Sequence, residues 1–301
     1  MRMHRLVAST AVAAAVGVCS ATADTGTAAA ASGCPALYVV AIPGTWETGS
    51  DRRTTGPGML SGVTDELPDS EQVVYVDYPA TAFPWEGKAY GASKKIAVDT
   101  ARSLIYQLEQ HCADARFALV GYSQGADAAG DLAAEIGGGS SVVAPDRIAG
   151  VGLLSDPRRS PTDIQVGPAV PGSGVRGSRP GGFGSITPRV RTICAAGDLY
   201  CSTDEEDFIT RVASTLGGVT DDSPESMQRY RIEATALLTE LRSEHDGPAA
   251  SPEEDQKAAS RRAIELGRFY GSGTHMSYGT YLVGDGKSSI RWLHDWVASL
   301  G

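Results

Sequence analysis

The sequence lacks three features that mark common classes of protein. Beyond the amino terminus it has no apolar run long enough to cross a bilayer. It has no excess of basic residues: its 301 residues carry a net charge of −10, which repels nucleic acid and anionic bilayers at long range. It also lacks Cys-x-x-Cys and clustered-histidine patterns. We therefore expect no membrane span in the mature chain, no nucleic-acid partner and no metal.

The amino terminus does contain a short apolar run. The stretch "MRMHRLVASTAVAAAVGVCSATADTG" has a basic start, an apolar run too short to span a membrane as a mature helix, and small residues at Ala21-Thr22-Ala23. It predicts a secretory signal: residues 1–31 are signal peptide and short flexible segment, and residues 32–301 are the mature domain. Cys19 is a candidate lipoprotein anchor, but Val18 before it is larger than such processing normally tolerates. We expect an exported, soluble monomer, outside the cell or in its envelope.

Four cysteines remain after removal of the leader. Four cysteines in an exported protein favour two disulfides over a metal site, and three pairings are possible in principle. They are Cys34, Cys112, Cys194 and Cys201.

Five short apolar runs without polar alternation predict strands of a parallel sheet that is covered on both faces. They begin at Ala36, Gln72, Arg116, Ile148 and Arg189. Apolar residues at helical spacing within 97–108 and 290–300 predict helices that alternate with the strands. The predicted fold class is α/β: a doubly wound, mostly parallel five-stranded sheet flanked by helices. Residues 203–268, rich in Glu, Arg and Ala, are predicted to be a helical insertion or lid.

The stretch Gly121-Tyr122-Ser123-Gln124-Gly125 matches the Gly-x-Ser-x-Gly nucleophile elbow. The pattern alone is common, but here it joins a predicted strand to the helix-forming run "ADAAGDLAAEI". In such a turn the hydroxyl stands above the sheet edge, and a β-carbon at either glycine would collide with the neighbouring strand or helix. The context favours Ser123 as a nucleophile over an ordinary turn serine.

A nucleophilic serine needs a histidine to take its proton and a carboxylate to orient that histidine. In this fold the chain order is serine, acid, histidine, and three histidines follow the elbow. His245, in the charged stretch "RSEHDGP", is predicted to lie on the surface, and His294, in the final helix, to be structural. His275 lies in the glycine-flanked stretch "GSGTHMSYGTY", from which a side chain can reach the sheet edge. We predict His275 as the base.

Two acids, Asp156 and Asp198, end predicted strands, where α/β enzymes build their sites. A Cys194–Cys201 bridge would close a tight loop around Asp198 and hold its carboxylate still. Chain entropy assigns that bridge about 2.5 kcal/mol, against about 4.5 kcal/mol for a Cys34–Cys112 bridge, so its larger benefit would be positional. Asp156 precedes Pro-Arg-Arg and is predicted to be a strand-end cap or an arginine partner. We predict Asp198 as the acid.

A tetrahedral intermediate also needs hydrogen-bond donors for its oxyanion. The residue after the nucleophile, Gln124, supplies one backbone N–H, and the second donor is expected from the loop after an early strand. The stretch "IPGTWETG" follows the first predicted strand, and its Thr45 has both a backbone and a hydroxyl donor.

These motifs together resemble the cutinase family of serine esterases. The resemblance is carried by "GYSQG", by "CAAGDLYC", by "GTWETG", by "HMSY" and by Cys112 eleven residues before Ser123, and it covers residues 34–201 and the tail from 270. It implies an α/β-hydrolase fold and no metal or organic cofactor. It implies these residues: a triad of Ser123, Asp198 and His275, an oxyanion hole of Thr45 and Gln124, and the bridges Cys34–Cys112 and Cys194–Cys201.

One spacing departs from the compact members of that family, which place the histidine shortly after the acid. Here 77 positions separate Asp198 from His275, and the sequence is more similar to the longer cutinase-like lipases and phospholipases of mycolate-making actinobacteria. We predict a secreted esterase or lipase for medium to long acyl chains of lipid, phospholipid or polyester, with transient contact with a lipid surface. The alternatives are an acyltransferase or thioesterase of envelope lipid metabolism, and a non-catalytic envelope-lipid-binding protein on the same scaffold.

Overall fold

The computed structural model describes residues 33–48, 58–141, 143–203, 267–269 and 271–301, with single helical positions at 225, 228, 232, 235 and 264. The predicted signal segment and almost all of the predicted insertion lie outside the described residues. The chain divides into two compact units, Met1–Gly33 and Cys34–Gly301, and the fold below is that of the second. None of the helices within the described ranges is both long and apolar enough to span a membrane.

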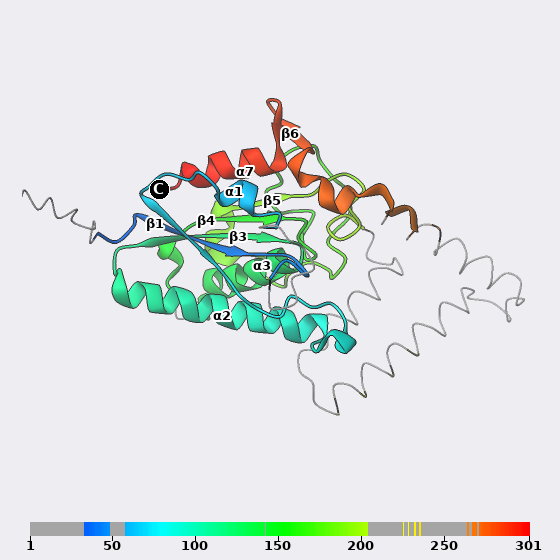
Figure 1. Cartoon of the computed structure of the whole chain (residues 1–301), viewed down its shortest axis with the longest axis horizontal. Coiled ribbons are helices and arrows are strands. Elements are labelled where there is room, and N and C mark those ends of the chain that lie inside the picture. Colours follow the sequence, from blue (N-terminus) through cyan, green and yellow to red (C-terminus); the bar gives the residue numbers. More distant parts are fainter. Residues whose placement is uncertain are drawn as a thin grey trace, which may run out of the picture. The chain divides into compact units, whose positions relative to one another are not determined.

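A parallel five-stranded sheet forms the centre of the second unit, in the order β2-β1-β3-β4-β5 (Figure 1). Its strands are β1 (Leu37–Ile42), β2 (Glu71–Tyr75), β3 (Arg116–Tyr122), β4 (Ile148–Leu154) and β5 (Val190–Ile193). Every residue of β1 is buried, and its side chains alternate between two hydrophobic cores, one on each face of the sheet. The continuous apolar runs therefore predicted the sheet correctly, because both of its faces are covered.

Helices cover both faces of this sheet (Figure 1). The core on one face includes side chains of α2 (Tyr90–His111) and α3 (Gln124–Gly137). The core on the other includes side chains of α1 (Ser61–Thr64) and α7 (Ser289–Ala298). The helices predicted within 97–108 and 290–300 are confirmed as α2 and α7, and the helix-forming run after the elbow is confirmed as α3. The remaining elements are short: the antiparallel pair β6 (Leu282–Gly284) and β7 (Lys287–Ser288), and the 3-10 helices η1 (Pro84–Glu86), η2 (Pro145–Arg147), η3 (Gly184–Arg189) and η4 (Thr274–Gly279).

The strand order places a topological switch point between β1 and β3. The chain leaves β1 toward α1 on one face, whereas it leaves the neighbouring strand β3 toward α3 on the other face. Where adjacent strands send their connections to opposite faces, a crevice opens at the carboxyl edge of the sheet. The loop that contains Thr45 and the elbow that contains Ser123 both begin at this edge.

Two disulfides stabilise the unit. Cys34–Cys112 spans 78 residues and joins the segment before β1 to the end of α2. Cys194–Cys201 spans only 7 residues and closes the loop after β5, which contains Asp198. The pairing is one of the three that the cysteine count allows.

The two bridges should differ in their contribution to stability because they close loops of different length. Replacing Cys34 and Cys112 with alanine is expected to lower the free energy of unfolding by about 4.5 kcal/mol, and replacing Cys194 and Cys201 by about 2.5 kcal/mol. Urea unfolding of the two double variants beside the oxidised wild type measures both losses. An equal or reversed order would contradict the loop-length argument.

Candidate active site

Ser123 occupies a sharp turn between β3 and α3. Its backbone has φ 54° and ψ −120°, a strained conformation for a residue with a side chain. A β-carbon on Gly121 would lie 2.4 Å from the carbonyl oxygen of Gly125, and one on Gly125 would lie 1.9 Å from the carbonyl oxygen of Ile42. Both glycines are therefore required, because α3 begins in direct backbone contact with the end of β1.

The structure brings Ser123, His275 and Asp198 together from three separate loops. His275, in η4, has its Nε2 3.0 Å from Ser123 Oγ and its Nδ1 3.0 Å from Asp198 Oδ2. Ser123 is 7% exposed, Asp198 is fully buried, and the His275 side chain is 20% exposed. The arrangement allows a proton to pass from the serine hydroxyl to the imidazole, beside a carboxylate that is shielded from water.

Both oxygens of the Asp198 carboxylate accept hydrogen bonds. Its Oδ2 accepts hydrogen bonds from the Ser155 hydroxyl at 2.6 Å and the Tyr278 hydroxyl at 2.7 Å, and its Oδ1 accepts one from the backbone N–H of Tyr200 at 3.1 Å. Burial alone would raise the pKa of Asp198, but the hydrogen bond and charge of His275 and the two hydroxyls hold that pKa below its ordinary value. Asp198 is therefore ionised at neutral pH.

Two tyrosine rings pack against the His275 imidazole. The Tyr122 ring centroid lies 5.2 Å from that of His275 at an interplanar angle of 27°, and the Tyr200 centroid lies 4.3 Å away at 40°. The Tyr122 hydroxyl also donates to the carbonyl oxygen of His275 at 2.8 Å, and Phe269 packs against Tyr200. These contacts restrict the orientation of the His275 ring.

Thr45 lies partly buried in the turn after β1. The side chain of Glu47 stabilises that turn through hydrogen bonds. The Glu47 carboxylate accepts the backbone N–H of Gly44 at 2.7 Å and that of Met59 at 2.8 Å. Burial raises the pKa of Glu47, although these two hydrogen bonds and the charge of His275 act to lower it. Sequence reasoning missed Glu47, whose position within the motif "GTWETG" was the available signal.

Gln124 is the first residue of α3, so its backbone N–H has no acceptor within the helix and is available to an anion. Its side chain is fully buried. The side-chain nitrogen donates to the carbonyl oxygens of Thr81 at 3.0 Å and Tyr90 at 3.3 Å. These contacts fix the residue and connect the elbow to the loop after β2.

The other candidates of the sequence lie elsewhere. Asp156 forms an ion pair with Arg179, at 2.5 and 3.1 Å, and is thus an arginine partner. His294 is buried in α7, and its Nδ1 lies 3.1 Å from the carbonyl oxygen of Val63 in α1. His245 lies outside the described residues. Besides Glu47, sequence reasoning missed Ser155, which directly precedes Asp156, and Tyr278, the last residue of "HMSY".

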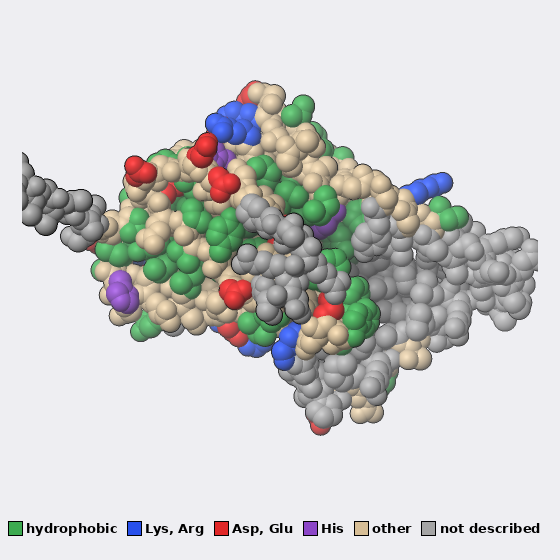
Figure 2. Space-filling model, in the orientation of Figure 1, with side chains coloured by type: hydrophobic (Ala, Val, Ile, Leu, Met, Phe, Trp, Pro, Cys, Tyr) green, Lys and Arg blue, Asp and Glu red, His purple; other side chains and the backbone are tan. Residues whose placement is uncertain are grey.

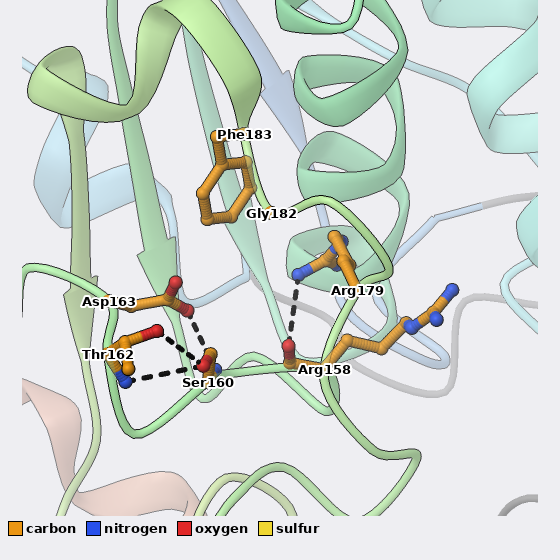
Figure 3. A pocket seen from close by; sticks show the side chains of 7 residues that line it. All are labelled: Arg158, Ser160, Thr162, Asp163, Arg179, Gly182 and Phe183. Carbon is orange, nitrogen blue, oxygen red and sulfur yellow. Dashed lines mark hydrogen bonds between the residues drawn. The ribbon is translucent and has the colours of Figure 1, made fainter.

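A small cavity of about 90 Å³ opens in the loop after β4 (Figure 3). Within it, the Asp163 carboxylate accepts a hydrogen bond from the backbone N–H of Ser160. The Arg179 side chain forms another part of the cavity wall. The cavity is lined by Arg158, Ser160, Thr162, Asp163, Arg179, Gly182 and Phe183. It includes none of the predicted site residues. Over the part of the chain that the structure describes, no three His, Cys, Asp or Glu side chains are grouped to hold a metal ion.

Comparison with known families agrees with this geometry. The family model for cutinase matches residues 33–213. The chain belongs to the cutinase family.

Curated relatives of this cutinase-family chain come from a bacterium and a fungus. It is 29% identical over 202 residues to a carboxylesterase Culp6 homolog of Corynebacterium glutamicum, covering 56% of this chain and 65% of the relative's length. It is 28% identical over 170 residues to cutinase CUT1 of Coprinopsis cinerea, covering 56% of this chain and 71% of that one. The chain therefore spans just under two thirds of the bacterial relative.

A solved structure with the same fold is lysin B from mycobacteriophage D29. The two structures match with a TM-score of 0.51 at 18% sequence identity, over 88% of this chain and 98% of lysin B. At this level of identity the likeness concerns the fold alone.

The contact between α3 and β1 makes Gly125 the most sensitive position of the elbow. Gly125→Ala is expected to lower the free energy of unfolding by about 3 kcal/mol or more, because the new methyl group would meet the Ile42 carbonyl and force the helix away from the strand. Gly271→Ala is the matched control, since a β-carbon there meets no atom within 4 Å. Urea unfolding of both variants measures the difference. Similar stabilities would show that the turn tolerates a side chain.

The lowered pKa of Asp198 predicts how its contribution to stability depends on pH. Its ionised form stabilises the folded state at pH values above the unfolded pKa of about 3.9, and this stabilisation is lost as the pH falls through the lower folded pKa. The difference in unfolding free energy between wild type and Asp198→Asn should therefore be largest above about pH 5 and shrink toward pH 3. Urea unfolding between pH 3 and 7 tests this. A difference that grows on acidification would contradict the lowered pKa.

Proposed function

We propose that this chain hydrolyses carboxylic esters through an acyl-enzyme intermediate. Ser123 is the nucleophile, His275 transfers the proton and Asp198 orients His275. The observation that supports this most strongly is the unbroken series of contacts from Ser123 Oγ to His275 Nε2 and from Nδ1 to Asp198, with distances of 3.0 Å at each step. Membership of the cutinase family supports the same chemistry.

The first half-reaction uses His275 as a base. Because Asp198 is ionised and can only accept hydrogen bonds, the imidazole proton lies on Nδ1 and Nε2 is free to accept. Nε2 removes the Ser123 proton as Oγ attacks the ester carbonyl, and a tetrahedral intermediate forms. The backbone N–H of Gln124 and the donors of Thr45 stabilise its oxyanion. His275 then protonates the departing alcohol, which leaves the acyl group on Ser123.

The second half-reaction repeats these steps with water. His275 Nε2 removes a proton from water, the hydroxide adds to the acyl carbonyl, and the same donors hold the second oxyanion. Collapse of this intermediate breaks the bond to Ser123 and returns the proton to its Oγ. The free acid leaves, and each residue regains its starting state.

The acyl specificity and the location of the enzyme are part of the same proposal. Three large hydrophobic side chains near the site residues are exposed. Trp46, next to Thr45, is 38% exposed, and Met276, next to His275, is 60% exposed. Trp85 is 77% exposed and precedes Glu86, which accepts a hydrogen bond from Trp46 Nε1 at 2.9 Å. Figure 2 shows hydrophobic side chains in several groups on one face of the molecule, mixed with polar side chains. Because each buried methylene contributes about 0.8 kcal/mol, such surroundings favour medium to long acyl chains over acetyl groups. The two disulfides favour an exported protein, since such bonds persist in oxidising compartments.

Ser123→Ala should lower the hydrolysis of a p-nitrophenyl octanoate ester by about a million-fold while the near-ultraviolet circular dichroism stays unchanged, because the nucleophile is lost and the turn is kept. A fluorophosphonate should label wild type at one residue and leave this variant unlabelled. Ser140→Ala, at an exposed serine just after the end of α3, should behave as wild type. Turnover retained in Ser123→Ala would refute the proposal, and absence of labelling in wild type would favour the non-catalytic lipid-binding alternative.

The same hydrolysis assay with acetyl esters in place of octanoate esters tests the acyl preference.

A further inference from the structure

The hydroxyl of Ser155 lies at the junction between His275 and Asp198. Its Oγ donates to Asp198 Oδ2 at 2.6 Å and is 3.0 Å from His275 Nδ1. Ser155 is fully buried, so no solvent water competes for these contacts. It immediately follows β4, on a different element from either partner. A side chain that touches both the acid and the imidazole can influence how they share a proton.

The backbone at Ser155 does not explain why a serine is present. Its φ is 52°, in the left-handed region that favours glycine, and its N–H donates to the carbonyl oxygen of Ile193 in β5 at 2.9 Å. Glycine would adopt this conformation at less energetic cost and keep the same backbone hydrogen bond. The hydroxyl is therefore the feature that distinguishes serine at this position.

The hydroxyl completes the set of donors to the Asp198 carboxylate. A carboxylate has about four sites for accepting hydrogen bonds. Here the donors are Ser155, the Tyr278 hydroxyl, the Tyr200 backbone N–H and His275 Nδ1. The Tyr278 hydroxyl is itself aligned by the backbone N–H of Ala195, at 3.1 Å. With every site occupied by a donor, the imidazole proton stays on Nδ1 and Nε2 faces Ser123 as an acceptor.

We propose that Ser155 is a positioning residue for ester hydrolysis: by holding Asp198 Oδ2 from the turn that follows β4, it fixes the tautomer and the direction of the His275 imidazole. Tyr278 holds the same oxygen from η4, so the carboxylate is fixed from two elements. The inference rests on the proposed function, because it assigns His275 the role of base.

Loss of the hydroxyl should change the charge balance in a defined direction. Without the Ser155 hydrogen bond, more negative charge remains on Asp198 Oδ2, and the His275–Asp198 pair holds the imidazole's positive charge more tightly. The acid side of the kcat/KM profile should therefore move to higher pH. Among the described residues, the other titratable side chains next to this pair are Glu47 and the phenols of Tyr122 and Tyr278, together with Tyr200, whose ring packs on His275, and all four remain in place.

The experiment compares Ser155→Ala with Ser155→Gly on a p-nitrophenyl octanoate ester. Both variants remove the hydroxyl, but only glycine favours the backbone conformation, so equal effects identify the hydroxyl as the cause. We expect kcat to fall roughly tenfold at neutral pH with KM nearly unchanged, and the acid side of the profile to move to higher pH in both. The matched control is Ser289→Ala. Ser289 is fully buried, and its hydroxyl donates to the carbonyl oxygen of Tyr281 at 3.0 Å, so its loss should leave the pH profile unmoved.

A second measurement does not depend on turnover. The Nδ1–H proton of His275 should give a strongly downfield proton NMR signal, assigned by its absence in His275→Asn. The signal should persist in Ser289→Ala and move upfield or broaden in both Ser155 variants. An unchanged signal and pH profile in both variants would overturn the inference, as would an effect confined to the alanine variant. Failure of the proposed function is distinct, because wild type would then show neither turnover nor fluorophosphonate labelling.

Discussion

The direct contact between the start of α3 and the end of β1 is the constraint on which the site depends. Because no side chain fits between Gly125 and the carbonyl of Ile42, the helix begins immediately above the sheet edge, and the preceding residue must turn sharply. Ser123 makes that turn with a positive φ of 54° and a ψ of −120°. The same contact places the loop after β1 beside the elbow, where a hydrolase needs its oxyanion donors.

A buried charge cluster holds the first turn of α3 in this position. Asp127, four residues after Ser123 and fully buried, accepts hydrogen bonds from Tyr90 at 2.9 Å and Arg176 at 2.5 Å. Burial raises the pKa of Asp127, but the charges of Arg176, Lys94 and Arg179 outweigh it and hold that pKa well below its ordinary value. A buried carboxylate with several cationic partners is tolerated only while those partners stay in place. The cluster therefore ties the elbow to α2 and to the loop after β4.

Asp198 is also a buried carboxylate, and hydrogen-bond donors rather than cations hold it in place. Asp198 is fully buried, and hydroxyl and backbone donors from three elements satisfy its carboxylate, while the Cys194–Cys201 bridge closes its loop. The buried guanidinium of Arg159 adds a hydrogen bond to the carbonyl oxygen of Cys201 at 2.7 Å. A carboxylate held in this way needs little reorganisation when the imidazole beside it becomes charged.

The sequence by itself determined the five strands, the helices α2 and α7, and the elbow at Ser123, because each depends on a local pattern of apolar residues, glycines and chain order. It also limited the candidates for the acid to Asp156 and Asp198, and the candidates for the base to three histidines. Only the tertiary structure decided that Ser155, Tyr278 and Glu47 reach the site. Glu47 and Tyr278 lie within recognised motifs, but no local sequence pattern indicates which residues these three side chains contact, and their contacts join positions up to 120 residues apart. The order of strands in the sheet, with its switch point between β1 and β3, brings them together.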